Sequence, residues 1–328
     1  MYLLLGFSGA ALALFLTPLI GRGSTVLGLV DAPGGRKVHA QSVPRLGGVA
    51  VVASAALALA IVPAFLPPPL RNPETWVAMQ PFIVGGLLIF LVGLVDDVRG
   101  LGPAPKLLVE LLAAAIMMAA GLLIERVTVL GHTWMLGWLA YPVTAAWLVG
   151  VTNAFNLIDG VDGLAPGIAA LAGAACGAIL IVRGHTAEAM LLAAFVGAML
   201  GFLVYNFEPA TIFLGDSGSL VAGFLLAATA IAGWQKGATA LASAVPLLIF
   251  ALPLADAAST LVRRVLTRPG SGRSLTAIVR QVVEPDREHI HHRLLGLGWS
   301  VRRTVLILYG VTAVLSILAL ATAQVDVR

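Results

Sequence analysis

Long apolar runs separated by short polar segments dominate this chain. Crossing an apolar core of about 30 Å takes roughly 20 helical residues, and these runs have that length without the two-residue alternation of barrel strands. The pattern therefore predicts an all-α, polytopic integral membrane protein, with residues 1–328 as a single transmembrane domain. About ten spans are expected, near residues 2–20, 45–66, 81–97, 104–124, 135–152, 165–182, 187–205, 217–234, 238–260 and 302–322.

Composition supports this interpretation. Of the 328 residues, 59% are hydrophobic and only 11% are charged, which is outside the range of soluble domains. We expect the first run to be an uncleaved span and not a removed signal peptide, because another apolar run follows it at once. The single cysteine, Cys176, excludes a disulfide or thiolate metal framework. Basic residues lie between the spans, which favours lipid headgroups over nucleic acid as their partner.

The loops after the odd-numbered spans share one side of the membrane and carry most of the 20 lysine and arginine residues. The positive-inside rule places that side in the cytoplasm and both termini outside, in the plasma (inner) membrane. Most acidic residues lie on the same side, although carboxylates contribute little to topology. A carboxylate within the bilayer costs about 3 kcal/mol, so we expect these acids to surround a cleft on the cytoplasmic side.

An acidic pair, Asp96 and Asp97, ends the third span. Two negative charges at a helix C-terminus oppose the helix dipole and repel each other, so the pair persists only beside a cation. Arg99 or a divalent metal could be that cation, and a solvated helix end is the alternative. Lys106, near the start of the next span, either extends to the headgroups or contacts a phosphate.

The segment NAFNLIDGVDGLA, residues 153–165, has two amides and two carboxylates at intervals of three residues. Asp–Gly pairs favour tight turns, so a loop is the simplest interpretation. A loop does not require this recurrence, however, and the same interval would place four side chains on one helical stripe. Such a stripe could bind a metal, a sugar hydroxyl or a base edge through Asn153, Asn156, Asp159 and Asp162.

The segment NFEPATIFLGDSGS, residues 206–219, follows the seventh span. Pro209 ends that helix, and Asp216 and Ser217 stand where the N-cap of the next helix belongs. The amides of a helix N-terminus also bind anions, and Asp216 beside them could hold a divalent ion that bridges to phosphate. Phe213 could pack against lipid or present its face to a nucleobase.

Histidine and basic residues collect in two loops on the same side. The expected cytoplasmic loop 261–301 contains DREHIHHRLL, where histidine beside arginine favours pyrophosphate contact. Zinc is disfavoured without cysteine ligands, and a polar turn is the alternative. The first loop ends in Gly47 and Gly48, which indicate close backbone approach or helix packing. The candidate phosphate- and sugar-binding residues of the two loops are Arg36, Lys37, His39, Arg45, His289, His291, His292 and Arg293.

Taken in order, these motifs resemble those of the polyprenyl-phosphate N-acetylhexosamine-1-phosphate transferases (glycosyltransferase family 4), the superfamily that includes phospho-MurNAc-pentapeptide transferase. The RKVH and HIHHRLL segments are similar to the GlcNAc-1-phosphate branch. The resemblance implies Mg²⁺-dependent transfer, with Mn²⁺ as a substitute ion, of GlcNAc-1-phosphate from UDP-GlcNAc to undecaprenyl phosphate. UMP is released, and the product initiates a cell-envelope polysaccharide such as teichoic acid or O-antigen.

The resemblance also implies a role for each motif. The catalytic residues would be Asp96, Asp97, Asp159 and Lys106, with Asp96 or Asp97 as the base on the lipid phosphate. Asp216, together with Asp97, would hold the metal, and uridine would lie against Asp162, Asn206 and Phe213. Asn153, Asn156 and the histidines would contact pyrophosphate and sugar. The expected partners are the two substrates and the lipid bilayer, and no nucleic acid is expected. A homodimer is one oligomeric state that the chain could form.

The chain departs from the family pattern at several positions, none of which is a proposed catalytic carboxylate, and two other interpretations also stay open. Glu110 stands where glutamine is common, Ser42 where proline is usual, and Ala257 where threonine is usual, which weakens any role for Asp256 beside it. One alternative is the MurNAc-pentapeptide branch of peptidoglycan synthesis. The other is a membrane transporter, for which acids near the middle of spans and internal repeats would be expected.

Overall fold

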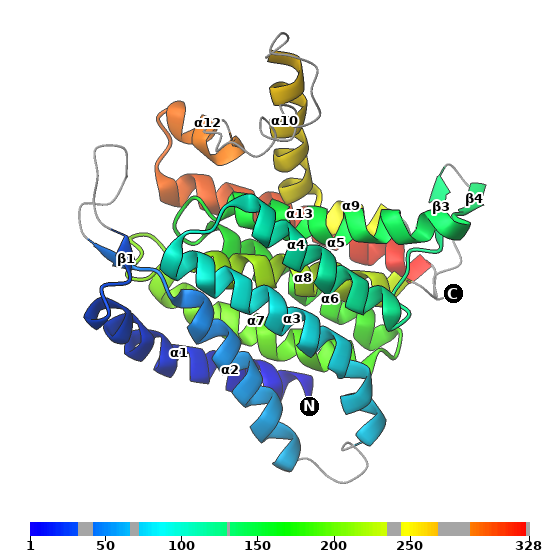
Figure 1. The fold of residues 1–328 in the computed structure, drawn as a ribbon, viewed down its shortest axis with the longest axis horizontal. Coiled ribbons are helices and arrows are strands. Elements are labelled where there is room, and N and C mark those ends of the chain that lie inside the picture. Colours follow the sequence, from blue (N-terminus) through cyan, green and yellow to red (C-terminus); the bar gives the residue numbers. More distant parts are fainter. Residues whose placement is uncertain (32–41, 66–71, 130–131, 235–243, 268–288, 326–328) are drawn as a thin grey trace.

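The computed structural model describes residues 1–31, 42–65, 72–129, 132–234, 244–267 and 289–325. Most of the long helices lie side by side in one bundle, α10 (Ala251–Thr267) extends away from it, and the two strand pairs lie at opposite ends (Figure 1). The other long helices are α1 (Tyr2–Val26), α2 (Gly47–Ile61), α3 (Pro73–Arg99), α4 (Pro103–Ala119), α5 (Ala140–Ile158), α6 (Leu164–Val182), α7 (Thr186–Asn206), α8 (Asp216–Trp234) and α13 (Val301–Val325).

The remaining elements are short. Strand β1 (Val30–Asp31) pairs antiparallel with β2 (Val43–Pro44), and β3 (Arg126–Val129) pairs antiparallel with β4 (His132–Met135). The short helices are η1 (Val62–Phe65), η3 (Gly137–Leu139), α9 (Ala244–Ile249) and α12 (Ile290–Gly296). The strands close loops at the two ends of the bundle and do not form its core.

Seven helices in the described part of the chain are long and apolar enough to cross a membrane. The expectation of an all-α, multi-pass membrane protein is therefore confirmed. The expected spans 104–124 and 135–152 correspond to α4 and α5. The expected span 238–260 is not one continuous helix in the described residues, because α9 ends at Ile249 and α10 begins again at Ala251.

Helix α8 lies at the centre of the bundle, where it contacts α2, α3, α5, α6 and α7. Glycine makes two of these contacts close. A Cβ atom on Gly93 would lie 2.6 Å from the Asp216 carbonyl oxygen, and one on Gly223 would lie 2.6 Å from the Thr152 Cα atom. Lipid tails are as apolar as the side chains, so the close packing that such backbone contact allows contributes to helix association in a membrane. The position of the α8 N-terminus is consequently fixed by its neighbours.

The polar motifs gather at one end of the bundle. Helices α3, α5 and α7 end there and α4, α8 and α13 begin there, beside the β1–β2 pair and α12 (Figure 1). The β3–β4 hairpin lies at the opposite end, as do the first residues of α1 and the last described residues of α13. The predicted gathering on one face is thus confirmed, and these acids occupy helix ends and not the middle of spans.

Candidate active site

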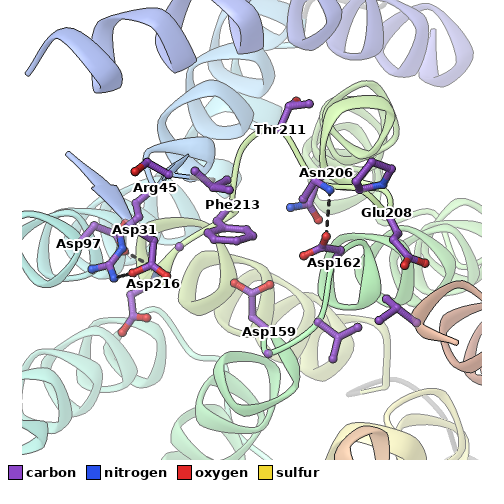
Figure 2. A pocket seen from close by; sticks show the side chains of 18 of the residues that line it. Asp31, Arg45, Asp97, Asp159, Asp162, Asn206, Glu208, Thr211, Phe213 and Asp216 are labelled. Atoms are coloured by element: carbon purple, nitrogen blue, oxygen red, sulfur yellow. Dashed lines mark hydrogen bonds and ion pairs between the residues drawn. The ribbon is translucent and has the colours of Figure 1, made fainter. Parts of the chain in front are cut away.

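The polar helix ends surround a cavity of about 990 Å³. Figure 2 shows Asp159, Phe213 and Asp216 around it, each from a different element, with Arg45 and Asp31 on one side. The polar residues that line it are Asp31, Ser42, Arg45, Asp96, Asp97, Asp159, Asp162, Asn206, Glu208, Thr211, Asp216 and His292. A cavity this rich in carboxylates favours ligands that carry or recruit cations.

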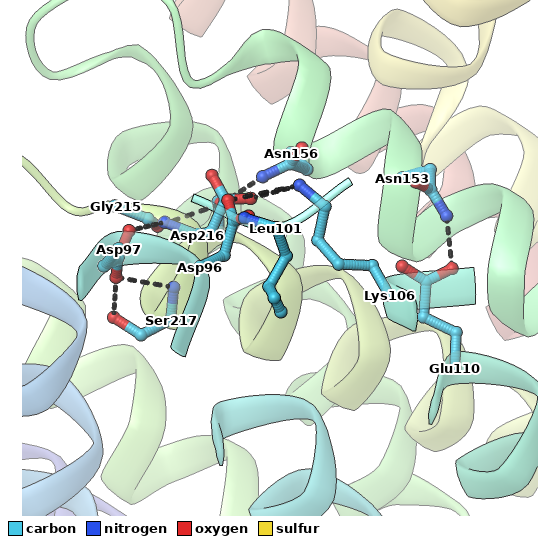
Figure 3. A network of polar contacts seen from close by, with 11 residues as sticks. Asp96, Asp97, Leu101, Lys106, Glu110, Asn153, Asn156, Gly215, Asp216 and Ser217 are labelled. Atoms are coloured by element: carbon cyan, nitrogen blue, oxygen red, sulfur yellow. Dashed lines mark hydrogen bonds and ion pairs between the residues drawn. The ribbon is translucent and has the colours of Figure 1, made fainter. Parts of the chain in front are cut away.

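Asp97 on α3 caps the N-terminus of α8. Its carboxylate accepts hydrogen bonds from the backbone N–H groups of Asp216 and Ser217, at 2.8 and 3.0 Å, and from the Ser217 hydroxyl at 2.6 Å (Figure 3). An anion is stabilised there because the first amides of a helix have no partner within the helix. The expected cap therefore comes from another helix, and Asp97 fixes the place from which Asp216 reaches the cavity.

Lys106 lies between two carboxylates. Its Nζ atom is 3.2 Å from Asp96 Oδ2 and 2.8 Å from Asp216 Oδ2, as Figure 3 shows. Asp96 also accepts a hydrogen bond from the Leu101 N–H at 2.5 Å. Lys106 thus supplies a cation beside Asp96, whereas Asp97 is stabilised by the amides at the start of α8. Two carboxylate oxygens from different helices converge on one positively charged point.

The two asparagines of α5 face protein partners. Asn153 donates to Glu110 Oε2 at 2.5 Å and to the Val149 carbonyl at 2.9 Å. Asn156 donates to the Ser219 hydroxyl at 3.0 Å, which ties α5 to the first turn of α8. Glu110 is only 3% exposed. Both asparagines support the walls of the cavity, and neither lines it.

The Asp–Gly segment after α5 is a turn. Helix α5 ends at Ile158, Asp159 follows as its C-cap, and α6 begins at Leu164 after Gly163, whose φ is +78°. The prediction of one helical stripe is therefore wrong beyond Asn156, because the two glycines favour the turn more strongly than the three-residue interval favours a helix. The turn is what separates the two acids from α5.

The two acids of this turn differ in their partners. Asp162 accepts a hydrogen bond from the Ala210 N–H at 2.9 Å, whereas Asp159 extends toward the centre of the cavity (Figure 2). Burial, followed by the charges of Asp216, Asp97 and Asp162, raises the pKa of Asp159 well above its usual value. Asp159 therefore holds a proton more readily than an ordinary aspartate does.

Phe213 is held by the first loop. Its N–H donates to the Pro44 carbonyl at 2.8 Å, and its carbonyl accepts from the Gly47 N–H at 2.9 Å. A Cβ atom on Gly47 would lie 2.3 Å from that carbonyl oxygen, so the predicted close backbone approach is confirmed. The Arg45 guanidinium contacts the Asp31 carboxylate across the β1–β2 pair. Arg36, Lys37 and His39 lie outside the described residues.

Asn206, at the end of α7, joins two loops of the cavity wall. Its side-chain oxygen accepts from the Gly163 N–H at 3.0 Å, and its nitrogen donates to the Ile212 carbonyl at 2.8 Å. With only 3% of its surface exposed, Asn206 fixes the loops that carry Asp162 and Phe213.

The three histidines have different surroundings. His292 lines the cavity, whereas His289 Nδ1 lies 2.8 Å from Asp256 Oδ2. His291 is 1% exposed and packs against Gly160, where a Cβ atom would lie 2.9 Å from its Nε2. Burial, followed by the neighbouring His292, lowers the pKa of His291 to about 4, so its ring is neutral near pH 7.

Comparison with known proteins identifies the family. The profile described as "Glycosyl transferase family 4" matches residues 79–234. A "probable undecaprenyl-phosphate N-acetylglucosaminyl 1-phosphate transferase" of Bacillus subtilis is 34% identical over 312 residues, which cover 94% of this chain and 81% of the relative. The chain belongs to glycosyl transferase family 4. The resemblance inferred from the motifs is thereby confirmed.

Two further relatives support the family 4 assignment. A "decaprenyl-phosphate N-acetylglucosaminephosphotransferase" of Mycolicibacterium smegmatis is 33% identical over 330 residues, covering 93% of this chain and 78% of the relative. An "undecaprenyl-phosphate alpha-N-acetylglucosaminyl 1-phosphate transferase" of Escherichia coli K12 is 28% identical over 297 residues, covering 88% and 75%.

The residues predicted for this family 4 chain fall into two groups. The first group lines the cavity and consists of Arg45, Asp96, Asp97, Asp159, Asp162, Asn206, Phe213, Asp216 and His292. The second group stands behind the lining and contacts protein partners. It comprises Lys106, Asn153, Asn156, His289 and His291. Arg293 lies on α12, and the catalytic and binding roles of all these residues stay predictions.

Sequence reasoning missed three acids that shape the family 4 cavity. Asp31 and Glu208 line it, and Asp256 holds the histidine segment, residues 289–292. Asp31 begins the same loop that contains Arg45, and this shared loop was an available signal. Asp256 was discounted because Ala257 replaces threonine, yet both Asp256 oxygens contact residues of the histidine segment.

Proposed function

We propose that this enzyme transfers GlcNAc-1-phosphate from UDP-GlcNAc to undecaprenyl phosphate, releases UMP, and so initiates a cell-envelope polysaccharide such as teichoic acid or O-antigen. The names of the three relatives support this donor and this class of acceptor. The observation that carries the proposal is the convergence of Asp96 and Asp216 on one cationic group beside the cavity. Two substrates that both carry phosphate repel each other, so their reaction requires positive charge held at such a point.

The carboxylates suit Mg²⁺. Magnesium is bound by oxygen ligands, commonly one or two protein carboxylates with water and substrate phosphates completing the shell. The described residues contain no cluster of three or more His, Cys, Asp or Glu side chains that could hold a metal, so substrate phosphates would complete the site. Asp216 would hold the ion, while Asp97, the other residue predicted for the metal, fixes Asp216 through the start of α8. The bound ion would supply positive charge that offsets the phosphates.

The residues around this point would orient the reaction. An oxygen of the lipid phosphate bonds to the β-phosphorus of the donor, while the bond from that phosphorus to the UMP oxygen breaks and its electron pair leaves with UMP. The face of Phe213 suits stacking on uracil. Arg45 and His292 line the same cavity and would contact the pyrophosphate and sugar.

Two carboxylates could accept the remaining proton of the lipid phosphate, whose pKa would be about 6. Asp96 contacts Lys106 and the Leu101 N–H, so part of its charge is already neutralised. Asp159 faces the cavity, and its raised pKa suits a proton acceptor. Both oxygens of Asp97 already accept hydrogen bonds. This disfavours Asp97 as the base, which was one of the two roles predicted for it from the sequence.

The proposal is tested by supplying purified protein with undecaprenyl phosphate, Mg²⁺ and either UDP-GlcNAc or UDP-MurNAc-pentapeptide, and measuring UMP. We expect turnover with UDP-GlcNAc only. Turnover with the pentapeptide donor alone would replace the assigned donor. No UMP from either donor, in protein that runs as a folded species on size exclusion, would remove the transferase function.

We also propose that the cavity end faces the cytoplasm. Met135 in the hairpin and Leu297 beside α12 lie at opposite ends of the bundle and are both 73% exposed. The native Cys176 is buried. Met135→Cys should therefore react with a membrane-impermeant maleimide in intact cells, and Leu297→Cys only after permeabilisation. The reverse pattern would invert the orientation.

A further inference from the structure

A buried carboxylate on α10 holds the histidine segment. Asp256 is 1% exposed, its Oδ2 lies 2.8 Å from His289 Nδ1, and its Oδ1 accepts a hydrogen bond from the Ile290 N–H at 2.7 Å. A buried carboxylate is tolerated only where charge or hydrogen bonds compensate it, and both oxygens are satisfied here. The contact joins residues 33 positions apart, so it fixes α12 relative to α10.

Ring contacts continue from this anchor toward the cavity. The His289 and His291 rings are stacked, with centroids 5.6 Å apart and an interplanar angle of 8°. The His291 and His292 centroids are 4.3 Å apart. His292 lines the cavity, whereas His289 is only 5% exposed. The orientation of the ring that lines the cavity thus depends on two buried rings and one buried carboxylate.

We propose that Asp256 is a positioning residue that acts through His289 and α12 to aim His292 at the donor substrate. A carboxylate beside Nδ1 favours the tautomer that carries the proton there and fixes the ring plane. Helix α12 has seven residues, too few to be stable without tertiary contacts. The contact of His292 with the donor rests on the proposed transferase function. The anchoring of α12 by Asp256 rests on the contacts described above.

The kinetic test is a double-mutant cycle between Asp256→Ala and His292→Ala. Misplacing a substrate contact by about 1 Å can lower the rate a hundredfold, so we expect kcat of Asp256→Ala to fall by up to about that factor. If Asp256 acts through His292, the double variant is no slower than His292→Ala alone. Asp256→Asn keeps an acceptor for the Ile290 N–H and should retain more activity than Asp256→Ala.

A matched control is available at the other end of the bundle. Glu188 forms a comparable pair with His185, at 3.6 Å, so Glu188→Ala removes the same charge far from the cavity and should keep the wild-type kcat. Multiplicative losses in the cycle would show that Asp256 does not act through His292. A wild-type kcat in Asp256→Ala would also overturn the inference.

A second measurement does not depend on activity. Hydrogen–deuterium exchange of a peptide covering residues 290–296 should become faster in Asp256→Ala. The increase should be smaller in Asp256→Asn, and Glu188→Ala should show none. Unchanged exchange in Asp256→Ala would overturn the anchor whatever the kinetics show. If the wild type releases no UMP, the proposed function fails while this exchange measurement still decides whether Asp256 holds α12.

Discussion

Two regions border the same cavity and are built differently. At the junction of α3, α4 and α8, Asp96, Asp97, Lys106 and Asp216 contact one another directly, and α8 is surrounded by other helices. The histidine segment lies on α12, beside α10, which extends away from the bundle (Figure 1). The comparison indicates that the charges proposed to act on the phosphates lie where helices enclose them, whereas the histidine proposed to contact the substrate lies on a short helix at the edge of the bundle.

Removing the charge of Asp216 at the junction of α3, α4 and α8 should cause the largest loss of activity. Asp216→Asn keeps the size of the side chain but removes one of the two charges that converge on Lys106. Loss of one preorganised electrostatic group typically lowers kcat by 10²–10³-fold, and loss of the proposed metal ligand adds to this, so we expect a fall of at least about a thousandfold in UMP release. Glu188→Gln, at the opposite end of the bundle, is the control. Normal turnover by folded Asp216→Asn would show that this junction is not required for the reaction.

Asp159 lies between the two regions and gives a prediction about pH. A base works only when deprotonated, and the pKa of Asp159 is raised, so wild-type kcat/KM should fall as the pH drops through that raised value. Asp159→Asn should lower kcat/KM by about a hundredfold at the optimum and remove this acidic limb. Profiles of kcat/KM against pH for Asp159→Asn and Asp96→Asn decide which acid is the base. An unchanged limb in Asp159→Asn would assign the proton elsewhere.

The two regions also differ in how much of them the sequence predicts. Helix-length apolar runs place Asp96, Lys106 and Asp216 at helix ends on one side, because membrane thickness leaves little freedom in where a span ends. That placement is enough to predict that they gather. The capping of α8 by Asp97 was not predictable, since it joins residues 119 positions apart and depends on the close approach allowed by Gly93.

Local sequence patterns predicted the structure of turns and short helices less well. The three-residue interval from Asn153 to Asp162 was compatible with a helix, but the Asp–Gly pairs ended it at Ile158. The histidine run indicated phosphate contact for all three rings, yet only His292 lines the cavity. Which ring faces a cavity depends on the tertiary partner of its neighbours, here Asp256, and no periodicity in the run encodes that partner.

Ser217→Ala tests the junction more gently. Its hydroxyl donates to Asp97 at 2.6 Å and is fully buried, while the two backbone donors to Asp97 remain. A typical hydrogen bond contributes about 1 kcal/mol, so we expect a fall of a few degrees in Tm and of about fivefold in kcat. Ser54→Ala removes a buried hydroxyl that bonds the Ala50 carbonyl within α2. It should match the loss of Tm and retain the wild-type kcat, and equal kcat losses in both variants would mean that the Asp97 contact has no special role.

Gly160→Ala tests the contact between the Asp159–Gly163 turn and the histidine segment, and its effect should be the smallest. A Cβ atom there would lie 2.9 Å from His291 Nε2, which is closer than a stable contact allows, and the ring is buried. A shift of the ring by a few tenths of an ångström would relieve the contact and displace His292, so we expect kcat to fall about threefold, well below the hundredfold cost of a full 1 Å misplacement. Gly102→Ala, where a Cβ atom meets nothing within 4 Å, is the matched control.

Against a His291→Ala background the methyl group has room, so Gly160→Ala should then change kcat no further. A loss that persists in that background would locate the strain in the Asp159–Gly163 turn itself and remove the contact between the turn and the histidine segment from the explanation.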